Sequence, residues 1–316
     1  MISLYLILIF ILFALAFTSS SLAKARNQSQ ALWFWLTLIF PIAILFIAIK
    51  DTKEEEIPIN SFNTSTALRT LITREIRRFL RIWVQTLVPP AVTISLYFVI
   101  FGSLIGPRIG TMDGFDYIQY MIPGLIMLSV ITNSYNNVVS SFYGVKFQKS
   151  IEELLISPMP NWSILFGFVI GGVVRGIIIG IIVYFVSLFF YPSFEVVNPG
   201  LTILVLLLTT ILFSLMGFVN AIFADSFDDI SIVPTFILTP LIYLGGVFYS
   251  INILPDFWRN ISMANPMLYV VSTFREGMLG VSDVSIPFAL GMIFSFIGIL
   301  TGLCLYLLNK GVGIRQ

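Results

Sequence analysis

The side chains with which most enzymes carry out acid–base or nucleophilic chemistry are nearly absent from this sequence. Histidine does not occur among the 316 residues, and Cys304 is the only thiol. A Ser-His-Asp triad, a Cys-His dyad, a His-based zinc motif and a disulfide are therefore excluded. We predict that the chain is not an enzyme and that it has no catalytic, cofactor-binding or metal-binding residues of its own.

A nucleotide-binding loop is also absent from the sequence. A phosphate-binding loop requires Gly-Lys followed by Ser or Thr. None of the six lysines follows a glycine; the residues before them are Ala23, Ile49, Thr52, Val145, Gln148 and Asn309. If ATP drives this protein, ATP and Mg²⁺ must be bound by a partner chain.

Apolar residues determine the class of the protein. They make up 58% of the chain, and the net charge of +1 provides no basic surface for nucleic acid. A transmembrane helix needs roughly 20 apolar residues, and long uninterrupted runs favour helices over the alternating strands of a barrel. Eight runs predict an all-α integral membrane protein: residues 2–17, 31–49, 84–105, 117–139, 162–191, 201–224, 230–250 and 286–308.

The positions of lysine and arginine predict the orientation of these runs. Loops rich in Lys and Arg stay in the cytoplasm, and strict alternation of the eight runs divides the loop residues eleven to five. Both termini are therefore predicted to be cytoplasmic. Lys24 and Arg26 fall on the poorer side. The first run is short, lacks a basic n-region and is followed by small residues, so it is either an uncleaved span or a poorly formed signal peptide.

A polar stretch after the second run divides the chain. Acidic residues at 51–56, Pro58 and the polar residues 60–66 are typical of a linker. We therefore expect an N-terminal transmembrane hairpin at 1–50, a polar linker at 51–66 and a six-span domain at 67–316.

Residues 67–83 have the period of an amphipathic helix, with arginines on one face and apolar side chains on the other. The arginines are Arg74, Arg77, Arg78 and Arg81, and the apolar residues are Leu68, Ile72, Ile76, Phe79 and Trp83. Such a helix is expected on the cytoplasmic membrane surface, with its arginines among headgroups or against a partner protein. The alternative is a juxtamembrane anchor that only determines topology. Pro89 and Pro90 predict a kink in the following span.

Residues 147–156 predict a short amphipathic helix in the loop between two spans. The residues that define it are Phe147, Ile151, Glu152, Glu153 and Leu154. The apolar ones repeat at helical spacing, and the two glutamates project sideways. This geometry suits a lever that docks into a groove on a cytoplasmic partner. An ordinary interfacial loop is the alternative.

Arg175 lies midway along the run 162–191. An intramembrane charge is costly, so its side chain must face the protein interior or a wet cavity. Two roles for Arg175 are open: structural pairing with carbonyls or a carboxylate, and contact with an anionic substrate. Gly172, Gly176 and Gly180 form a stripe of small residues beside it, which permits close helix packing.

Residues 255–280 are too often interrupted to cross a membrane. Asn265 and Pro266 break the apolar stretches, and Arg275 and Glu276 add charge. A pair of short re-entrant helices that dip into the outer leaflet fits this pattern, because irregular backbone at depth is tolerated where protein or water surrounds it.

Five segments of the chain resemble a known family. They are RIWVQTLVPP from Arg81, PGLIMLSVITNSY from Pro123, SIEELLISPMP from Ser150, DDISIVPTFILTPLIYLGGVFYS from Asp228 and NPMLYVVSTFREGMLG from Asn265. Together they are similar to the permease subunit of ABC-2 type transporters, in particular to the YadH-like inner-membrane permeases of Gram-negative bacteria. The resemblance covers about residues 67–315.

The resemblance implies roles for the predicted parts. It implies an ABC-2 type permease domain at 67–316 that works as a homodimer in the lipid bilayer. Residues 67–83 would be its connecting helix, residues 147–156 a coupling helix that sits on a separate ABC ATPase subunit, and residues 255–280 its re-entrant helices at the outer face. The hairpin before Asp51 is usually absent from that family.

We therefore expect the membrane-spanning permease subunit of an ATP-binding cassette exporter in the bacterial inner membrane. It would form the path for an amphipathic substrate, such as a lipid, glycolipid, polysaccharide or drug. The main alternative is an ion-coupled secondary transporter. Such carriers commonly bury carboxylates or His near the midplane, whereas these span centres hold Arg175 and almost no acid.

Overall fold

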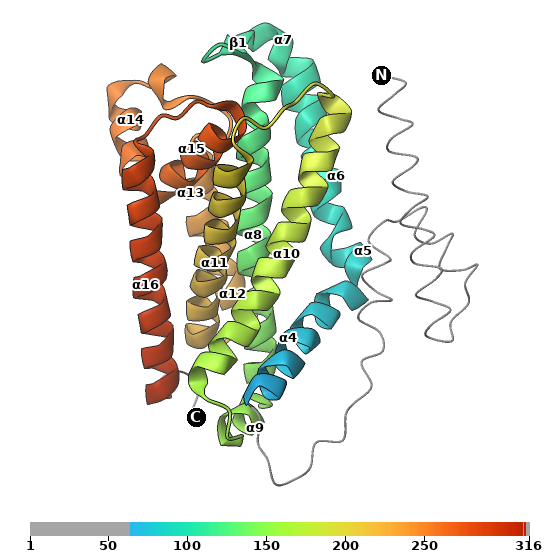
Figure 1. The fold of residues 1–316 in the computed structure, drawn as a ribbon, viewed down its shortest axis with the longest axis vertical. Helices are drawn as coiled ribbons and strands as arrows, with labels where there is room; N and C mark the ends of the chain where they lie inside the picture. The colour runs from blue at the N-terminus through green and yellow to red at the C-terminus, as the bar shows by residue number, and fades with distance from the viewer. Residues whose placement is uncertain (1–63, 312, 314–316) are drawn as a thin grey trace, which may run out of the picture. The chain divides into compact units, whose positions relative to one another are not determined.

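The computed structural model describes residues 64–311 and 313. The predicted hairpin at 1–50 and most of the predicted linker at 51–66 lie outside these residues. The described part is almost entirely helical, and its long helices run side by side (Figure 1).

The helices and strands follow one another in this order. They are α4 (Thr64–Arg81), α5 (Trp83–Thr86), α6 (Val88–Tyr97), the π-helix η1 (Phe98–Ile105), α7 (Gly106–Ile109), β1 (Thr111–Met112), β2 (Phe115–Asp116), α8 (Tyr117–Phe147), α9 (Ile151–Ile156), α10 (Asn161–Phe190), α11 (Pro199–Phe223), α12 (Asp229–Ile232), the π-helix η2 (Val233–Leu238), α13 (Thr239–Leu244), the 3₁₀ turn η3 (Ile251–Ile253), α14 (Asp256–Met263), α15 (Pro266–Leu279) and α16 (Ile286–Lys310).

Among the described residues, four helical stretches are long and apolar enough to cross a membrane. They are Trp83–Ile109, Asn161–Phe190, Pro199–Phe223 and Ile286–Lys310. These stretches coincide with four of the six spans predicted between residues 84 and 308. The other two predictions fall on α8 and on the shorter apolar helix Asp229–Leu244.

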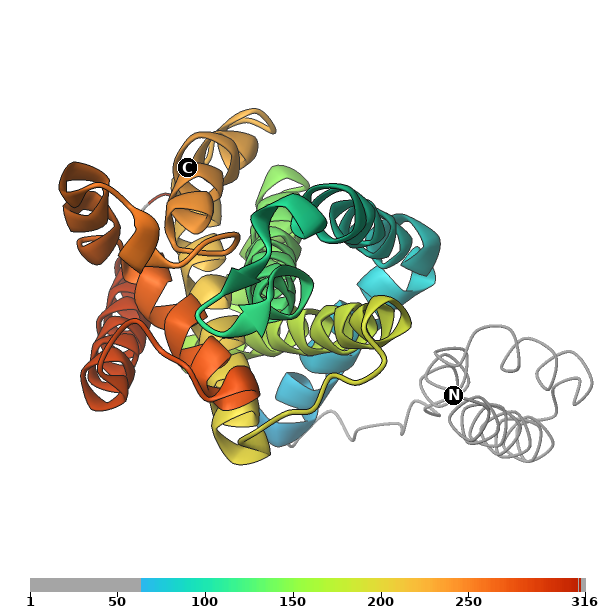
Figure 2. The ribbon, with the colours of Figure 1, turned by 90° about the horizontal axis from the view of Figure 1, so that it is seen from above.

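α8 is the central helix of the described bundle. It packs along α10 and α11, it lies near the middle of the described helices in Figure 2, and every residue from 120 to 131 is buried. Because protein surrounds it, α8 tolerates polar side chains that a lipid-facing span excludes. Its buried polar residues are Ser129, Asn133, Ser134, Asn137 and Ser141.

The span predicted at 230–250 is not helical over its last residues. Its helix ends at Leu244, after Pro234 and Pro240 have interrupted the hydrogen-bond ladder. The stretch that contains Pro234 is π-helical. Gly246 then adopts a φ of +75°, a conformation that glycine reaches without steric strain.

Residues 245–250 are not helical and pack against α8. A Cβ at Gly124 would lie 2.3 Å from the carbonyl oxygen of Val247, so only glycine at this position of α8 allows the contact. Irregular backbone of this kind is tolerated in a membrane protein because other protein elements surround it.

The predicted kink near Pro89 and Pro90 is present. α4 covers Thr64–Arg81 rather than residues 67–83, α5 is a single turn, and α6 begins at Val88. Pro90 has no N–H, so the carbonyl of Thr86, four residues earlier, loses its helical hydrogen-bond donor. We call residues 81–90 the elbow.

The glycines of α10 bring its neighbours close, as the small-residue stripe predicted. A Cβ at Gly172 would lie 2.3 Å from the Ser214 hydroxyl on α11, and a Cβ at Gly176 would lie 2.0 Å from the Ser134 hydroxyl on α8. At Gly171 the near atom is the Cβ of Glu75 on α4, at 2.8 Å. The same helix therefore packs closely against three others.

The two ends of the bundle are built differently (Figure 1). We call the end that carries α9 the α9 end. At the opposite, hairpin end, β1 and β2 pair through Thr111 with Asp116 and Met112 with Phe115. The turn residues Asp113 and Gly114 have φ of +48° and +86°, as a tight Asp-Gly hairpin requires. α14 and α15 form the pair of short helices predicted within 255–280.

Candidate functional site

The buried face of α4 is centred on a carboxylate. Leu71, Glu75 and Phe79 recur every fourth residue, and all three are buried, Glu75 with only 1% of its surface exposed. α10 receives this face at Gly171. The buried face of α4 is therefore rotated about the helix axis relative to the apolar face predicted for residues 67–83. Glu75 lies in the middle of this buried face.

Glu75 is held by partners from two helices. Arg78 Nε lies 3.3 Å from Glu75 Oε2, Arg74 Nη2 lies 3.4 Å from Oε1, and the Ser141 hydroxyl donates to Oε2. Arg78 Nη2 also donates to Asn137 Oδ1 at 2.9 Å and to the Asn137 carbonyl at 3.0 Å. A buried charge requires such partners. These five residues, the Glu75 cluster, bond α4 to α8.

The four arginines predicted to share an outward face have different surroundings. Arg81 is exposed, and Arg77 is half-buried. The Arg74 guanidinium lies 5.8 Å from the centre of the Phe168 ring. Arg78 turns inward to α8, so the expectation that it faces headgroups or a partner protein is wrong. Its long side chain starts beside the buried face and reaches across it to Asn137.

Arg175 projects from α10 toward α8 and the elbow. Its Nη2 donates to Asn133 Oδ1 at 3.0 Å and to the Thr86 carbonyl at 3.3 Å. That carbonyl is the one that Pro90 leaves without a helical donor, so Arg175 satisfies a backbone group that the kink frees. These contacts support structural pairing of Arg175 rather than contact with an anionic substrate.

The predicted coupling helix at 147–156 is divided by a turn. Phe147 ends α8, Lys149 has a left-handed φ of +59°, and α9 begins only at Ile151. A left-handed residue cannot continue a right-handed helix, so Phe147 does not share a helical face with Ile151. Ile151 is buried, Leu154 is half-buried, and Glu152 and Glu153 are exposed.

Lys146 ties the end of α8 to the end of α11. Its Nζ donates to the carbonyls of Ile222 at 2.8 Å and Ala224 at 2.7 Å, and it lies 3.6 Å from the Asp225 carboxylate. The last carbonyls of a helix lack helical donors, and a cation there also complements the helix dipole. In the sequence, Lys146 is one of the eleven loop charges that predict the orientation, and nothing there predicts this contact.

Aromatic side chains surround this tie at the α9 end. The Phe227 ring lies 4.9 Å from the Phe147 ring and 5.0 Å from the Tyr143 ring. In the same connection, Asp229 accepts the backbone N–H groups of Asp225 at 3.0 Å and Ser226 at 2.9 Å. The α11–α12 connection is therefore an ordered turn held against α8.

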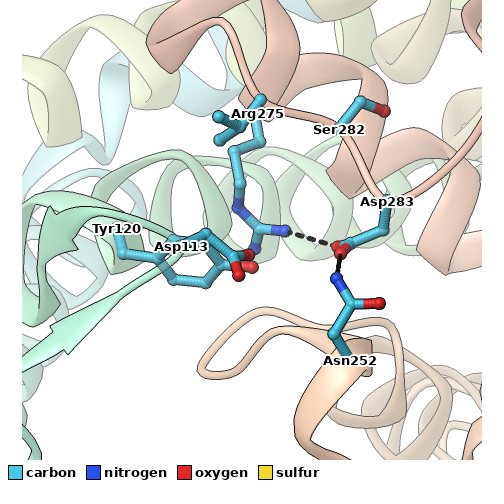
Figure 3. Close-up of a pocket in the computed structure, with 7 residues that line it drawn as sticks. Asp113, Tyr120, Asn252, Arg275, Ser282 and Asp283 are labelled. Atoms are coloured by element: carbon cyan, nitrogen blue, oxygen red, sulfur yellow. Dashed lines mark hydrogen bonds and ion pairs between the residues drawn. The ribbon is translucent and has the colours of Figure 1, made fainter.

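Arg275 is buried at the hairpin end, with 1% of its surface exposed. Its Nη1 lies 3.2 Å from Asp283 Oδ2, its Nη2 donates to the Gly246 carbonyl, and its guanidinium carbon lies 4.1 Å from the centre of the Tyr120 ring (Figure 3). Asn252 Nδ2 donates to the same carboxylate at 3.4 Å. Burial raises the pKa of Asp283, and Arg275 opposes that shift.

A cavity of about 250 Å³ lies beside these side chains. It is lined by Asp113, Tyr120, Asn252, Arg275, Val281, Ser282 and Asp283 (Figure 3). Of this set, only Arg275 is a site residue predicted from the sequence. The Asp-Gly pair at 113–114 was the one local signal for the hairpin that carries Asp113.

The other residues predicted in 255–280 serve the fold of α15. Asn265 accepts the Met267 N–H at 3.0 Å and donates to the Leu241 carbonyl at 2.6 Å, and Pro266 is the first residue of the helix. This is a helix start of the usual kind, with Asn before Pro. Glu276 is half-buried.

Known proteins resemble this chain over most of its length. The family model described as ABC-2 type transporter matches residues 66–279. The chain is 55% identical over 250 residues to the inner membrane transport permease YadH of Escherichia coli K12, which covers 79% of this chain and 97% of that protein. It is 21% identical over 197 residues to Nodulation protein J of Rhizobium meliloti, covering 62% of this chain and 75% of that protein. The family match spans more than half of the chain, and the chain therefore belongs to the ABC-2 type transporter family, as a multi-pass, inner-membrane permease subunit that works with an ATP-binding partner.

Proposed function

We propose that the chain forms, as a homodimer, the translocation path of an ATP-driven exporter for an amphipathic substrate. ATP and Mg²⁺ would be bound by the separate ABC ATPase, and this chain would hold no cofactor. The substrate would be a lipid, glycolipid, polysaccharide or drug. The main support for the proposal is the structure of the α9 end, where the exposed helix α9 and the residues beside it contact the long helices.

The α9 end has the character of a docking surface for the ATPase. Glu152 and Glu153 are exposed on α9, and the residues Phe147 and Phe227 beside it are 61% and 56% exposed. Exposed aromatic residues rimmed by charge are typical of protein interfaces. The predicted orientation, in which the Lys- and Arg-rich loops are cytoplasmic, places this end on the side of the ATPase.

A continuous series of contacts leads from α9 into the bundle. Lys146 joins the end of α8 to α11, and one to three turns away on the same helix Ser141 and Asn137 bond to the Glu75 cluster. Force applied to α9 would therefore reach α4 through α8 and its polar contacts. Such a network is a physical route for coupling, which mutations must test.

The remaining expectations complete this proposal. We retain the division into 1–50, 51–66 and 67–316, and we take α8 and Asp229–Leu244 as the second and fifth of six spans. α8 would be shielded from lipid by its neighbours, and the irregular residues 245–250 would complete the fifth span. The segment 255–280 would be re-entrant at the outer face, opposite α9.

The docking proposal is tested by a triple variant, Glu152→Lys, Glu153→Lys and Leu154→Asp. It should reduce the amount of ATPase that copurifies with each chain by about tenfold, because it reverses two exposed charges and adds a third charge to the surface. The amount of chain in the membrane should not change. Glu195→Lys, an exposed charge reversal beyond α10, is the matched control. Unchanged assembly and transport in the triple variant would remove α9 from the mechanism.

Glu75 supports the ion-coupled secondary transporter as a second candidate. It is a buried carboxylate among helices, which such carriers use to bind protons. Its three partners favour a structural anion instead. Proteoliposomes separate the two functions: the exporter requires the ATPase and ATP, whereas a carrier would transport under a pH gradient alone and lose that activity in Glu75→Gln.

A further inference from the structure

One face of α8 changes from buried to exposed along the helix. The residues on this face recur at helical spacing, every third or fourth position, and we call them the α8 stripe: Leu125, Ser129, Thr132, Asn136 and Ser140. Leu125 and Ser129 are buried, and Thr132 is half-buried. The last two residues of the stripe are exposed. The stripe is therefore covered toward the hairpin end and open toward the α9 end.

The open part of the α8 stripe is polar at the depth of the membrane interior. Asn136 lies one turn from Asn133, which binds Arg175 in the middle of α10. Thr132 and Ser140 donate to carbonyls of their own helix, but the Asn136 side chain makes no hydrogen bond with the described residues. An exposed amide without a partner is costly in hydrocarbon and not in water. We therefore expect this face of α8 to contact water rather than acyl chains.

Two tyrosine hydroxyls on neighbouring helices lie at a similar depth. Tyr97 is near the middle of the 27-residue span Trp83–Ile109, and its hydroxyl lies 3.2 Å from that of Tyr243 on α13. Only one of the two can donate to the other, so the second O–H has no acceptor among the described residues. Tyrosine is usually found at the membrane–water interface. At mid-membrane this pair also requires water.

Aromatic rings join the tyrosine pair to segments that cover α8. We call four residues the aromatic cluster: Tyr97, Phe101, Tyr243 and Phe248. The Phe248 ring lies 5.0 Å from the Phe101 ring and 5.8 Å from each tyrosine ring. The neighbours of these phenylalanines pack on α8, because a Cβ at Gly102 would lie 2.7 Å from an α8 side chain and Val247 lies against α8 as well. The aromatic cluster therefore bridges two segments that pack on the hairpin-end half of α8.

Both helices that carry the tyrosines are π-helical next to them. η1 begins directly after Tyr97, and η2 ends directly before α13, the helix of Tyr243. π-Helical segments are rare and occur frequently at functional sites. Their position on both sides of the pair is a second, independent indication that the pair has a function.

We propose that the aromatic cluster is a gate on the path of the cargo. The exposed part of the α8 stripe lines the open, water-filled half of this path, and the aromatic cluster closes the half toward the hairpin end. The hydrogen bond between Tyr97 and Tyr243 joins α6 to α13 and holds the gate shut. It must break before the two helices separate around a cargo. This inference rests on the proposed export function, because it takes the path to run along this chain.

The first part of the test measures thiol modification in membrane vesicles that contain the full-length chain. In a Cys304→Ala background, an impermeant cationic methanethiosulfonate is added to either side of the membrane. Asn136→Cys and Ser140→Cys should react from the same side as Ser150→Cys, which marks the α9 end. Leu125→Cys should react about tenfold more slowly, because a buried thiol is reached only when the structure opens.

A position that faces lipid is the control for this part. Ile299 on α16 is 65% exposed and apolar, so Ile299→Cys should not react with a charged reagent. Lipid against the α8 stripe would give the same result at positions 136 and 140. A second copy of the chain packed on the stripe would also prevent reaction there. Only water along this face admits the reagent.

The second part of the test removes the hydroxyls and keeps the rings. Tyr97→Phe or Tyr243→Phe should raise the modification rate of Leu125→Cys about fivefold, which corresponds to the loss of one net hydrogen bond. The double variant should give no further rise, because both substitutions remove the same bond. Tyr269→Phe is the matched control. Its hydroxyl donates to the Met263 carbonyl at 2.8 Å, so its loss should leave the rate unchanged.

Several results would overturn the proposal. They are absence of reaction at positions 136 and 140, equal rates at 125, 136 and 299, unchanged rates in both phenylalanine variants, and an equal rise in Tyr269→Phe. None of these rates requires ATP or the ATPase. A failure of the gate therefore leaves the export function standing, and a failure of ATP-driven transport leaves the pattern of accessibility standing.

Discussion

Arg175 donates a hydrogen bond to a backbone carbonyl that a proline leaves without a donor in another helix. Pro90 removes the N–H that would pair with the Thr86 carbonyl, and a carbonyl without a donor is costly where water is scarce. Arg175 Nη2 supplies that donor at 3.3 Å and binds Asn133 at 3.0 Å. At the scale of the residue, the intramembrane charge therefore has a structural partner on each of two elements.

We expect Arg175→Met to destabilise the folded chain by about 1–3 kcal/mol, because it leaves the Thr86 carbonyl and the Asn133 amide oxygen unpaired. The melting temperature of the detergent-purified chain measures this. Transport should fall only in proportion to folded protein, and Arg175→Lys should be intermediate because it keeps the charge but loses the planar fork. Arg259→Met, at an exposed arginine of α14, is the control.

The two roles of Arg175 give different results. Normal folding with loss of substrate-stimulated ATP hydrolysis in Arg175→Met would favour contact with substrate over the structural role. Normal folding together with normal transport would contradict both.

At the scale of the element, the elbow is the joint between α4 and the first described span. Thr86 Oγ1 donates to the Phe79 carbonyl at 3.0 Å, and its own carbonyl accepts from Arg175. The joint is thus held by hydrogen bonds that a continuous helix would not need. This makes the elbow a defined bend between the Glu75 cluster and the span.

Pro90→Ala tests whether the proline creates the need for Arg175. Alanine restores an N–H that can pair with the Thr86 carbonyl, so Arg175→Met should cost less in the Pro90→Ala background than in the wild type. We expect a coupling free energy of about 0.5–1.5 kcal/mol in a double-mutant cycle of unfolding free energies. Pro89→Ala is the control, because its N–H would pair with Gln85 instead. Additive costs would show that the two residues act independently.

At the scale of the whole molecule, the α9 end and the hairpin end should lie on opposite sides of the membrane. Cys304 is buried and is the single cysteine of the sequence. Cys304→Ala therefore provides a background without thiols. Single cysteines at Ser65, Asp113, Ser150 and Ser282 then report the topology, and a fifth at Ser20 reports the N-terminal hairpin. An impermeant thiol reagent added outside should label positions 20, 113 and 282 only, because the Lys- and Arg-rich loops are held in the cytoplasm.

Labelling at 65 or 150 from outside would contradict the predicted orientation of the permease domain. Failure of labelling at position 20 alone would contradict only the arrangement of the first two runs. Reagent added to inverted membranes should give the complementary pattern.

Sequence alone determined the features that depend on neighbours along the chain. Apolar runs of span length, the kink at Pro89 and Pro90, the close-packed glycines of α10 and the paired short helices in 255–280 are all local patterns. The five family segments are local as well. Each of them reflects a backbone or side-chain property that acts within a few turns of one helix, which is why period and composition were enough to predict it.

Only the tertiary structure decided which polar side chains are buried and what they bind. Glu75 has no predicted role, although its spacing from Leu71 and Phe79 was a signal that it shares their buried face. Its partner Ser141 is 66 residues away, and Asp113, Tyr120 and Arg275 meet from three separate segments. Whether a polar residue faces lipid, water or another helix depends on the helix packed against it. The period of its own helix contains no information about that neighbour.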